Sequence, residues 1–403
     1  MKNKDYQALT PAEDALNIIR KCFQNEKRGN IKARDDAKED LKKFLVKTDD
    51  GSYTVNSNKR FGKSETMHTY HGALTESLEK FVKPAKLKGK NKVSILDICS
   101  GLGYNAASCI EFLDKMTEIE IDMVEISPET VGAALLIENP VKSYEIIKRV
   151  VEEYFYEKGT LEFKFHKLEI PDRLNINIYI EDARDLVKKF QYKKKFDAIF
   201  LDPFSPAKSP ELYTLEFFLK LKNLLKNDGI ILTYTSAAPV RSAMVHAGLY
   251  VGEGPQFGRS GGTLAAKNPE IIKKPLSMDD ERMIALSDAG IPFIDPKLNE
   301  SSKNIIKMRE DERKAARGRT RFASTVKIPI YLYKDIEEER LKRRVLRNIK
   351  MLGIDDLKSE EAKFIVCPQF NECICNCGYG KMNNSKDRIN EMIKRLKLIS
   401  LKN

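Results

Sequence analysis

The chain has 403 residues, 41% of them hydrophobic and 32% charged, which is typical of folded domains and excludes a wholly disordered chain. Its formal net charge of +12 favours an anionic partner such as RNA, although a solvated lysine-rich surface would give the same balance. No apolar run approaches the roughly 18 residues that span a bilayer and the start lacks a signal core, so we expect a soluble, cytoplasmic protein without a membrane partner.

Residues 1–90 are predicted to form a helical and hairpin extension that contributes to a substrate site. The motif TPAED supplies a capping residue, a proline suited to a first helical turn and a glutamate that closes the cap. A helical hairpin is expected to about Val46, followed by a turn into a strand around Gly51. An amphipathic helix is predicted from about His71.

Strands alternate with helices over residues 91–275. The apolar segments VSILDI, IEIDMVEI, NINIYI, DAIFL and GIILTYT are separated by helical patterns, which predicts a parallel sheet with helices on both faces. Continuous apolar strands such as DAIFL fit burial on both sides. The segment VKSYEIIKRVVEEYFYEKG predicts an extra helix after the second strand. The predicted fold is therefore α/β, with a class I, Rossmann-like core.

Residues 276–403 are predicted to be a basic appendage and not a second catalytic domain. The alternating pattern stops there, and a basic, less periodic stretch follows. A helix is expected from about Asp335 to Leu352, then a cysteine cluster and a final basic helix.

The loop DICSGLGYNA is the first candidate site. It places Asp97, Gly101 and Gly103 at a strand-to-helix turn, where glycine lets the backbone turn tightly and a ligand approach closely. Glu125 ends the next strand, about where a carboxylate accepts hydrogen bonds from ribose hydroxyls, and Asp182 follows a third strand, about where it bonds an adenine amine. These five residues are predicted to bind a nucleoside-containing cofactor.

Two cofactors are compatible with this loop. Because Ala106 lies three residues after Gly103, the loop also satisfies the permissive dinucleotide fingerprint, and NAD has to be considered. The EDAR element and the acidic LDPF loop stand in the third and fourth positions, which S-adenosylmethionine enzymes use. The order of the elements therefore favours S-adenosyl-L-methionine and predicts a methyltransferase.

The segment FDAIFLDPFSPAKSPELYT is the predicted reaction loop. Asp202 directly follows its apolar strand and so lies at the carboxyl edge of the sheet, where open α/β sheets bind ligands. A carboxylate there can orient and deprotonate a nucleophile. Phe204 and Tyr213 are candidates to line a pocket for a planar ring. The alternative is that Asp202 only caps the turn before Pro203.

At this point the chain resembles a known family, the MnmC-like methyltransferases, whose methyltransferase domain completes 5-methylaminomethyl-2-thiouridine at the tRNA wobble position. The resemblance covers roughly residues 48–295. It is carried by LDPFSPAKSPELYT, by TYTSAAPVRSAMVHAGLYVGEGPQFGRSGGTLA, and by TDDGSYT followed by Glu65, His68, Gly72 and Glu76.

The resemblance implies a tRNA partner and an acceptor amine on a 5-aminomethyluridine-type wobble base. It also implies that Asp202 acts at that amine, and that the cofactor is held by Gly101, Gly103, Glu125 and Asp182. Glu65 and His68 would lie in the substrate pocket. No second glycine fingerprint follows in this sequence, so we expect it to lack the flavin oxidase half of the bifunctional enzyme and a separate enzyme to supply the amine.

Two arginines on loops near the predicted site have two interpretations. Arg241, in SAAPVRS, and Arg259, in FGRSGG, are candidates for RNA phosphate contacts, or they brace the fold against a carboxylate. The pair His68 and His71 lacks a matched third ligand, so a packing or pocket role is favoured over a metal.

Four cysteines cluster near the end of the chain. Their pattern, CxxxxxCxCxC, suits zinc or an iron–sulfur cluster, with reduced thiols or disulfides as alternatives. The predicted ligands are Cys367, Cys373, Cys375 and Cys377.

Two other functions stay open from the sequence. A polyamine aminopropyltransferase shares the predicted fold and an acidic loop after the fourth strand, but its glycine loop carries an additional acidic residue that DICSGLGYN lacks. A non-catalytic RNA-binding module would use the basic tail, and would leave Asp202, Glu125 and Asp182 in cofactor order by coincidence.

Overall fold

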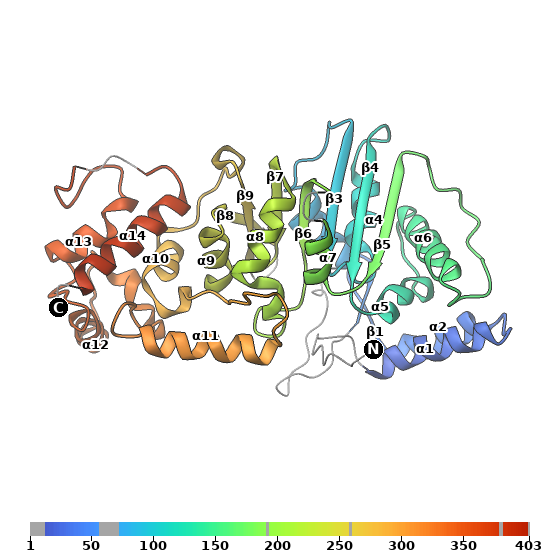
Figure 1. The fold of residues 1–403 in the computed structure, drawn as a ribbon, viewed down its shortest axis with the longest axis horizontal. Helices are drawn as coiled ribbons and strands as arrows, with labels where there is room; N and C mark the ends of the chain where they lie inside the picture. The colour runs from blue at the N-terminus through green and yellow to red at the C-terminus, as the bar shows by residue number, and fades with distance from the viewer. Residues whose placement is uncertain (1–12, 56–71, 191–192, 258–259, 379–381, 402–403) are drawn as a thin grey trace. The chain divides into compact units, whose positions relative to one another are not determined.

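The computed structural model describes residues 13–55, 72–190, 193–257, 260–378 and 382–401 (Figure 1). None of the helices in these ranges is both long enough and apolar enough to cross a membrane.

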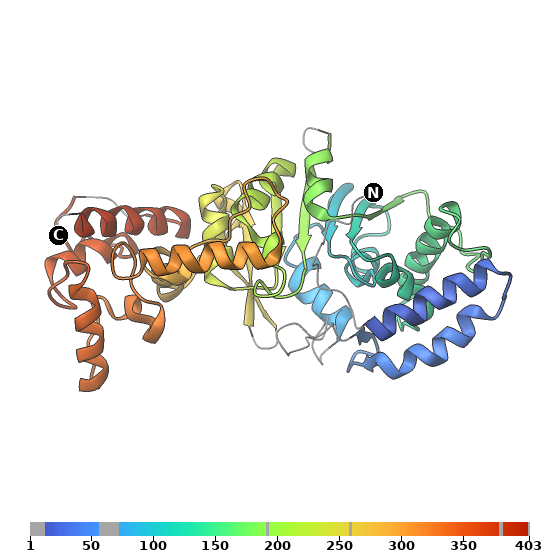
Figure 2. The same cartoon turned by 60° about the horizontal axis from the view of Figure 1, so that its bottom comes forward.

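The described part of the chain starts with the predicted helical hairpin, whereas Thr10 and Pro11 of the predicted cap lie outside it. Helices α1 (Glu13–Lys27) and α2 (Ala33–Leu41) lie side by side and are followed by η1 (Lys42–Phe44) and the antiparallel strands β1 (Leu45–Lys47) and β2 (Tyr53–Val55) (Figure 2). Gly51 lies in the turn between the two strands with φ of 81°. The helix expected from about His71 is observed as α3 (Ala73–Glu76), continued by η2 (Ser77–Val82).

A buried ion cluster fastens this hairpin to helix α6 (Ser143–Glu157), the extra helix predicted after the second strand. The Arg34 guanidinium pairs with Glu26 at 2.7 Å and also with Glu152, and all three side chains are buried. Glu152 also accepts a hydrogen bond from the His166 backbone N–H at 2.8 Å. Because every charged group has a partner of opposite charge, the cluster can be buried.

A seven-stranded sheet forms the centre of the fold, in the order β5-β4-β3-β6-β7-β9-β8. The pairs β3–β4, β3–β6, β4–β5 and β6–β7 are parallel, and all six residues of β6 are buried, as expected for a parallel strand covered on both faces. The predicted α/β fold is therefore confirmed. The strands are β3 (Lys92–Ile98), β4 (Glu118–Glu125), β5 (Leu174–Ile180), β6 (Phe196–Leu201), β7 (Leu225–Thr233), β8 (Tyr250–Phe257) and β9 (Ser260–Ala266).

Helices connect these strands, as the alternating pattern predicts. Ser127 shows how they begin, since its hydroxyl caps α5 by accepting the Thr130 N–H, and Pro128 follows at the first helical position. The connecting helices are α4 (Tyr104–Phe112), α5 (Pro128–Ala133), η3 (Ala134–Leu136), α6, α7 (Ala183–Phe190), η4 (Pro210–Tyr213), α8 (Leu215–Leu224) and α9 (Ala238–His246).

The chain divides into two compact units. The first comprises Met1–Leu212, Asn223–Tyr234 and Gly254–Gly262, and the second comprises Tyr213–Lys222, Thr235–Glu253 and Thr263–Asn403. The first unit contains β3 to β7, whereas the chain passes from one unit to the other within β8 and within β9. These units describe packing, so the domain boundaries proposed after residues 90 and 275 stay predictions.

The second unit is mainly helical toward the C-terminus. Ser277, Ser301, Ser359 and Asn384 each cap a helix by accepting a backbone N–H. The predicted helix near 335–352 and the predicted final basic helix are both observed. The helices are η5 (Pro269–Ile271), α10 (Met278–Leu286), η6 (Asp288–Gly290), α11 (Ser302–Ala316), η7 (Thr325–Tyr331), α12 (Glu339–Lys350), α13 (Glu360–Val366), η8 (Cys367–Gln369) and α14 (Ser385–Ser400).

Candidate active site

The glycine loop after β3 makes a tight turn into α4. Gly101 and Gly103 have φ of 53° and 82°, and the Gly103 N–H donates to the Ser100 carbonyl at 2.8 Å. A Cβ on Gly103 would lie only 2.7 Å from Cγ2 of Ile147. Both the left-handed backbone and this close approach therefore require glycine at 103.

Asp97 is fully buried at the end of β3, immediately before this loop. Asn105 donates from Nδ2 to Asp97 Oδ1 at 3.0 Å. Burial, reinforced by the charge of Glu125, raises the pKa of Asp97 to about 7. Asp97 Oδ2, Ser100 Oγ and Asn105 Oδ1 are buried without a hydrogen-bond partner among the described residues. Buried acceptors normally have hydrogen-bond partners, so these three atoms mark a place where a bound ligand would supply donors.

Glu125 ends β4, and backbone groups fix its carboxylate at the same sheet edge. It accepts hydrogen bonds from the N–H groups of Gly101 at 3.2 Å, Ile126 at 2.9 Å and Ser127 at 3.1 Å. Burial raises the pKa of Glu125 above its ordinary value, against the opposing effect of these hydrogen bonds. The carboxylate therefore has a fixed direction, with about one of its four lone-pair positions left for a ligand.

Asp182 follows β5, whose end is joined to β4 by a hydrogen bond from the Glu181 N–H to the Glu125 carbonyl at 3.1 Å. The nearly buried Arg184 holds both carboxylate oxygens of Asp182, with Nη2 to Oδ2 at 2.9 Å and Nε to Oδ1 at 3.2 Å. The side chain of Asp182 is thus oriented by Arg184 of the following helix α7, and adenine binding there stays a prediction.

Asp202 follows β6, and its N–H donates to the Ile98 carbonyl at 3.1 Å, which sets it beside the end of β3. Burial raises the pKa of Asp202 well above its ordinary value. The charges of Asp97 and Glu76 add to this effect, and Lys80 opposes it. The side chain is partly exposed, so a carboxyl group with a high pKa can meet a substrate.

The structure adds a pair that the predicted site lacked. Lys80 lies on η2 with Nζ 3.4 Å from Glu76 Oε1 and 6.0 Å from the ring centroids of both Tyr234 and Phe257. Glu76 belongs to the motifs that carry the family resemblance, and the i,i+4 spacing of Glu76 and Lys80 on a helix was the signal that would have found this pair.

Cys99 lies at the same edge, in the left-handed conformation with φ of 61°. Burial raises the pKa of its thiol well above the ordinary value, and the charges of Glu125, Asp202, Glu211 and Asp97 act in the same direction. The thiol is therefore held in its neutral form and is not an activated nucleophile. The edge is strongly acidic, which favours a ligand with positive charge or with many hydrogen-bond donors.

The remaining predicted residues have different surroundings. Phe204 is partly exposed on the loop after β6, whereas Tyr213 is fully buried and belongs to the second unit. Arg241 lies in helix α9 and not on the predicted loop. It is buried, pairs with Asp280 at 2.8 Å and donates to Thr263 Oγ1 at 2.9 Å, which is the geometry of the bracing alternative. Its role in substrate binding stays a prediction. Glu65, His68 and Arg259 lie outside the described residues.

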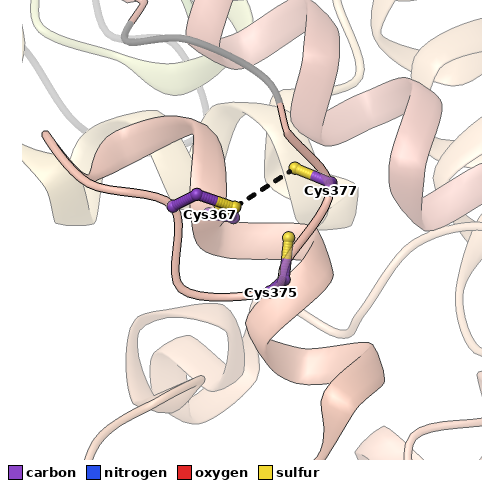
Figure 3. A group of neighbouring side chains, drawn as sticks. Cys367, Cys375 and Cys377 are labelled. Atoms are coloured by element: carbon purple, nitrogen blue, oxygen red, sulfur yellow. Dashed lines mark hydrogen bonds between the residues drawn. The ribbon is translucent and has the colours of Figure 1, made fainter.

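The four C-terminal cysteines come together in the second unit. All their Sγ atoms lie within 4.8 Å of one another, and Figure 3 shows the side chains of Cys367, Cys375 and Cys377 directed toward one another. None of the seven cysteines forms a disulfide, so the disulfide alternative is not observed.

Comparison with known proteins relates the chain to a methyltransferase family and to an archaeal protein of similar length. A family described as S-adenosyl-L-methionine-dependent methyltransferase matches residues 142–269. The uncharacterized protein MJ0670 of Methanocaldococcus jannaschii is 37% identical over 363 residues, which cover 88% of this chain and 95% of that protein.

MnmC proteins are also similar to this chain. The tRNA 5-methylaminomethyl-2-thiouridine biosynthesis bifunctional protein MnmC of Campylobacter hominis is 26% identical over 42% of this chain, but the match spans only 25% of that protein. The crystal structure of MNMC2 from Aquifex aeolicus is similar with a TM-score of 0.52 and 27% identity, covering 70% of this chain and 92% of that chain.

Proposed function

Because the chain belongs to the family of MJ0670 and is an S-adenosylmethionine-dependent methyltransferase related to the methyltransferase domain of MnmC, we propose that it N-methylates a 5-aminomethyluridine-type wobble base of tRNA. The observation that carries this proposal is Asp202, a carboxyl group with a raised pKa at the sheet edge where the glycine turn also lies. The tRNA substrate itself comes from the similarity to MnmC proteins.

The charge of the site supports S-adenosylmethionine over a dinucleotide. Asp97, Glu125, Asp202 and Glu211 are close enough to raise the pKa of Cys99. A sulfonium and an ammonium group are attracted to such an edge, whereas the anionic diphosphate of NAD would be repelled. The negative charge of this sheet edge thus favours S-adenosylmethionine, as does the order of the sequence motifs.

The donor groups of the described residues fit this cofactor. Glu125 would accept a hydrogen bond from a ribose hydroxyl, and Asp182 would accept one from the adenine amine. The acceptors without partners on Asp97, Ser100 and Asn105 would receive further donors. When bound, the cofactor supplies an electrophilic methyl group on sulfur.

Asp202 would handle the proton of the acceptor amine. If that amine titrates like lysine, near pKa 10.4, about one molecule in a thousand is free base at neutral pH, and freeing the lone pair costs about 4 to 5 kcal/mol. A carboxylate with a raised pKa is a stronger base than an ordinary aspartate, so the proton passes to it more readily. Asp202 would also orient the amine nitrogen toward the methyl donor.

Aromatic groups near Asp202 suit a flat substrate. Phe204 lies two residues beyond Asp202 and is partly exposed. The rings of Tyr234 and Phe257 both lie near Lys80, which in turn acts on the pKa of Asp202. Stacking on aromatic side chains is the common way in which proteins hold an unpaired base.

Helix α12 supports a nucleic-acid partner. The helical repeat sets its exposed cations on the side opposite the buried Val345 and Ile349. None of them forms an ion pair with a carboxylate in the described part of the chain, so their charge is available to phosphates. The exposed cations are Arg340, Arg343, Arg344, Arg347 and Lys350.

The remaining parts of the proposal follow from the substrate. The protein would act in the cytoplasm, and a separate enzyme would supply the aminomethyl group. The alternative, aminopropyl transfer to a polyamine, would use the same acidic edge. Metal binding at Cys367, Cys373, Cys375 and Cys377 is a separate proposal and has no step in methyl transfer.

The test is incubation of the protein with methyl-labelled S-adenosylmethionine and tRNA that carries 5-aminomethyl-2-thiouridine, followed by nucleoside analysis. Label in the 5-methylaminomethyl nucleoside supports the proposal. Label only in another nucleoside would refute the stated acceptor, and use of decarboxylated cofactor with a polyamine would establish the alternative.

A further inference from the structure

We propose that the four C-terminal cysteines bind a single zinc ion and that Arg395 compensates its negative charge. In the second unit, Cys367 Sγ lies 3.8 Å from Cys373 Sγ, which lies 3.7 Å from Cys377 Sγ. Four sulfurs about 2.3 Å from one tetrahedral zinc ion lie about 3.8 Å apart. The thiols are therefore spaced as the ligands of one ion.

The same spacing argues against an iron–sulfur cluster. In such a cluster each thiolate binds a different iron, and bridging sulfides separate the irons, so the thiolates stand farther apart than around one ion. Here all four Sγ atoms lie within 4.8 Å of one another. Zinc is favoured over a redox metal because four thiolates that close a tetrahedron are the usual set of a structural zinc site.

Arg395, on α14, provides the second observation. Its Nη2 lies 3.5 Å from Cys377 Sγ and its Nη1 lies 3.8 Å from Cys375 Sγ, although the side chain is only 1% exposed. Four thiolates around Zn²⁺ leave two negative charges in excess, and a guanidinium with N–H groups directed at sulfur offsets one of them. Four neutral thiols would attract a buried guanidinium much less strongly than four thiolates do.

Arg395 is also fixed from its other side, which makes it a positioning residue. Its Nη1 donates to the Phe364 carbonyl at 2.8 Å, its Nε pairs with Glu391 at 2.9 Å, and its guanidinium carbon lies 4.7 Å from the Phe364 ring centroid. Phe364 belongs to α13 and Glu391 to α14. The ion would thus fasten the cysteine segment to both helices, and zinc binding would be coupled to folding of this part of the second unit.

The test uses the full chain purified under reducing conditions without added metal. We expect one zinc per chain by elemental analysis, no acid-labile sulfide, and visible absorption of a tetrahedral thiolate site after exchange to cobalt(II). Cys373 is exposed, so Cys373→Ser should fold but bind zinc more than ~100-fold more weakly in a chelator competition. Arg395→Met should weaken zinc by ~10 to 100-fold, with partial rescue in Arg395→Lys.

The matched control is Cys22→Ala, which removes a buried thiol of α1 and should leave the zinc content unchanged. A folded, reduced wild-type protein without metal would overturn the proposal. So would iron with acid-labile sulfide, full zinc occupancy in Cys373→Ser, or an equal loss of zinc in Cys22→Ala. Equal zinc affinity in wild type and Arg395→Met would overturn the role of Arg395.

Discussion

Asn105 donates a hydrogen bond from Nδ2 to Oδ1 of Asp97 over 3.0 Å, inside the first turn of α4 and below the glycine loop. The other carboxylate oxygen of Asp97 and the amide oxygen of Asn105 have no hydrogen-bond partner in the described chain. The Asp97 carboxyl group therefore keeps an unpaired oxygen next to the proposed cofactor site. Because its pKa is raised by burial, the stability of the first unit depends on pH.

Asp97→Asn should remove this dependence. The folded-state pKa of Asp97 is about 7, above the value of roughly 3.9 for an unfolded chain, so the folded state binds more protons between these values. Its contribution to stability is full below about pH 3.9, falls as pH rises to about 7, and stays low above that. The free energy of unfolding of Asp97→Asn, relative to that of wild type, should therefore increase by up to about 4 kcal/mol as the pH rises from about 3.9 to about 7.

Urea unfolding of both proteins at several pH values, followed by circular dichroism, measures this difference. A difference between variant and wild type that is the same at about pH 5 and about pH 8 would contradict the raised pKa.

Glu125→Gln should weaken S-adenosylmethionine binding. The carboxylate accepts hydrogen bonds from three backbone N–H groups and would also accept one from a ribose hydroxyl, whereas an amide has only one acceptor oxygen. We expect the Kd to rise by about 10-fold or more in calorimetry. Glu118→Gln, at the exposed start of the same strand, is the control and should bind like wild type. Equal affinities in both variants would remove Glu125 from the cofactor site.

Neutralising α12 should weaken tRNA binding without changing the chemistry. Arg343→Gln combined with Arg347→Gln removes two exposed charges, so tRNA affinity should fall and the salt slope of log K should decrease by up to about 2. Methylation of a free aminomethyl nucleoside should not change. The control is Lys38→Gln on α2 combined with Lys42→Gln on η1, where both lysines pair with carboxylates. An unchanged salt slope in the α12 variant would exclude this surface from RNA binding.

Removal of zinc should destabilise the C-terminal helices while leaving cofactor binding in place. The proposed ligands lie in the second unit, whereas Glu125, Asp182 and Asp202 lie in the first. After chelation in reducing buffer, amide exchange over α13 and α14 should accelerate, because metal binding is coupled to folding. Exchange over β3 and β4 should not. Unchanged protection of both helices after complete metal removal would contradict this coupling.

The sequence predicts the five strands β3 to β7 because each contains an apolar segment between helical patterns, whereas β8 and β9 were not predicted. β6 illustrates this, since all its residues are buried and Asp202 follows directly. The N-terminal turn at Gly51 was equally predictable, because local residue types alone determine it.

The pairs that involve distant residues were not predictable in the same way. Arg241 pairs with Asp280, a partner 39 positions away, and the sequence alone leaves the bracing and phosphate-binding alternatives equal. The approach of Lys80 to Tyr234 and Phe257 likewise depends on the folding of separate segments. The cysteine pattern predicted a metal site, but the choice between one ion and a cluster needed the sulfur spacing.

The most direct measurement compares wild type with Asp202→Asn, using methyl-labelled S-adenosylmethionine and tRNA that carries 5-aminomethyl-2-thiouridine. If Asp202 receives the proton of the acceptor amine, turnover should fall at least ~100-fold, because asparagine cannot take up a proton. The Kd for S-adenosylmethionine should stay within about 3-fold of the wild-type value. Wild-type turnover in Asp202→Asn, or a loss of turnover explained entirely by lost cofactor binding, would contradict the assignment of Asp202.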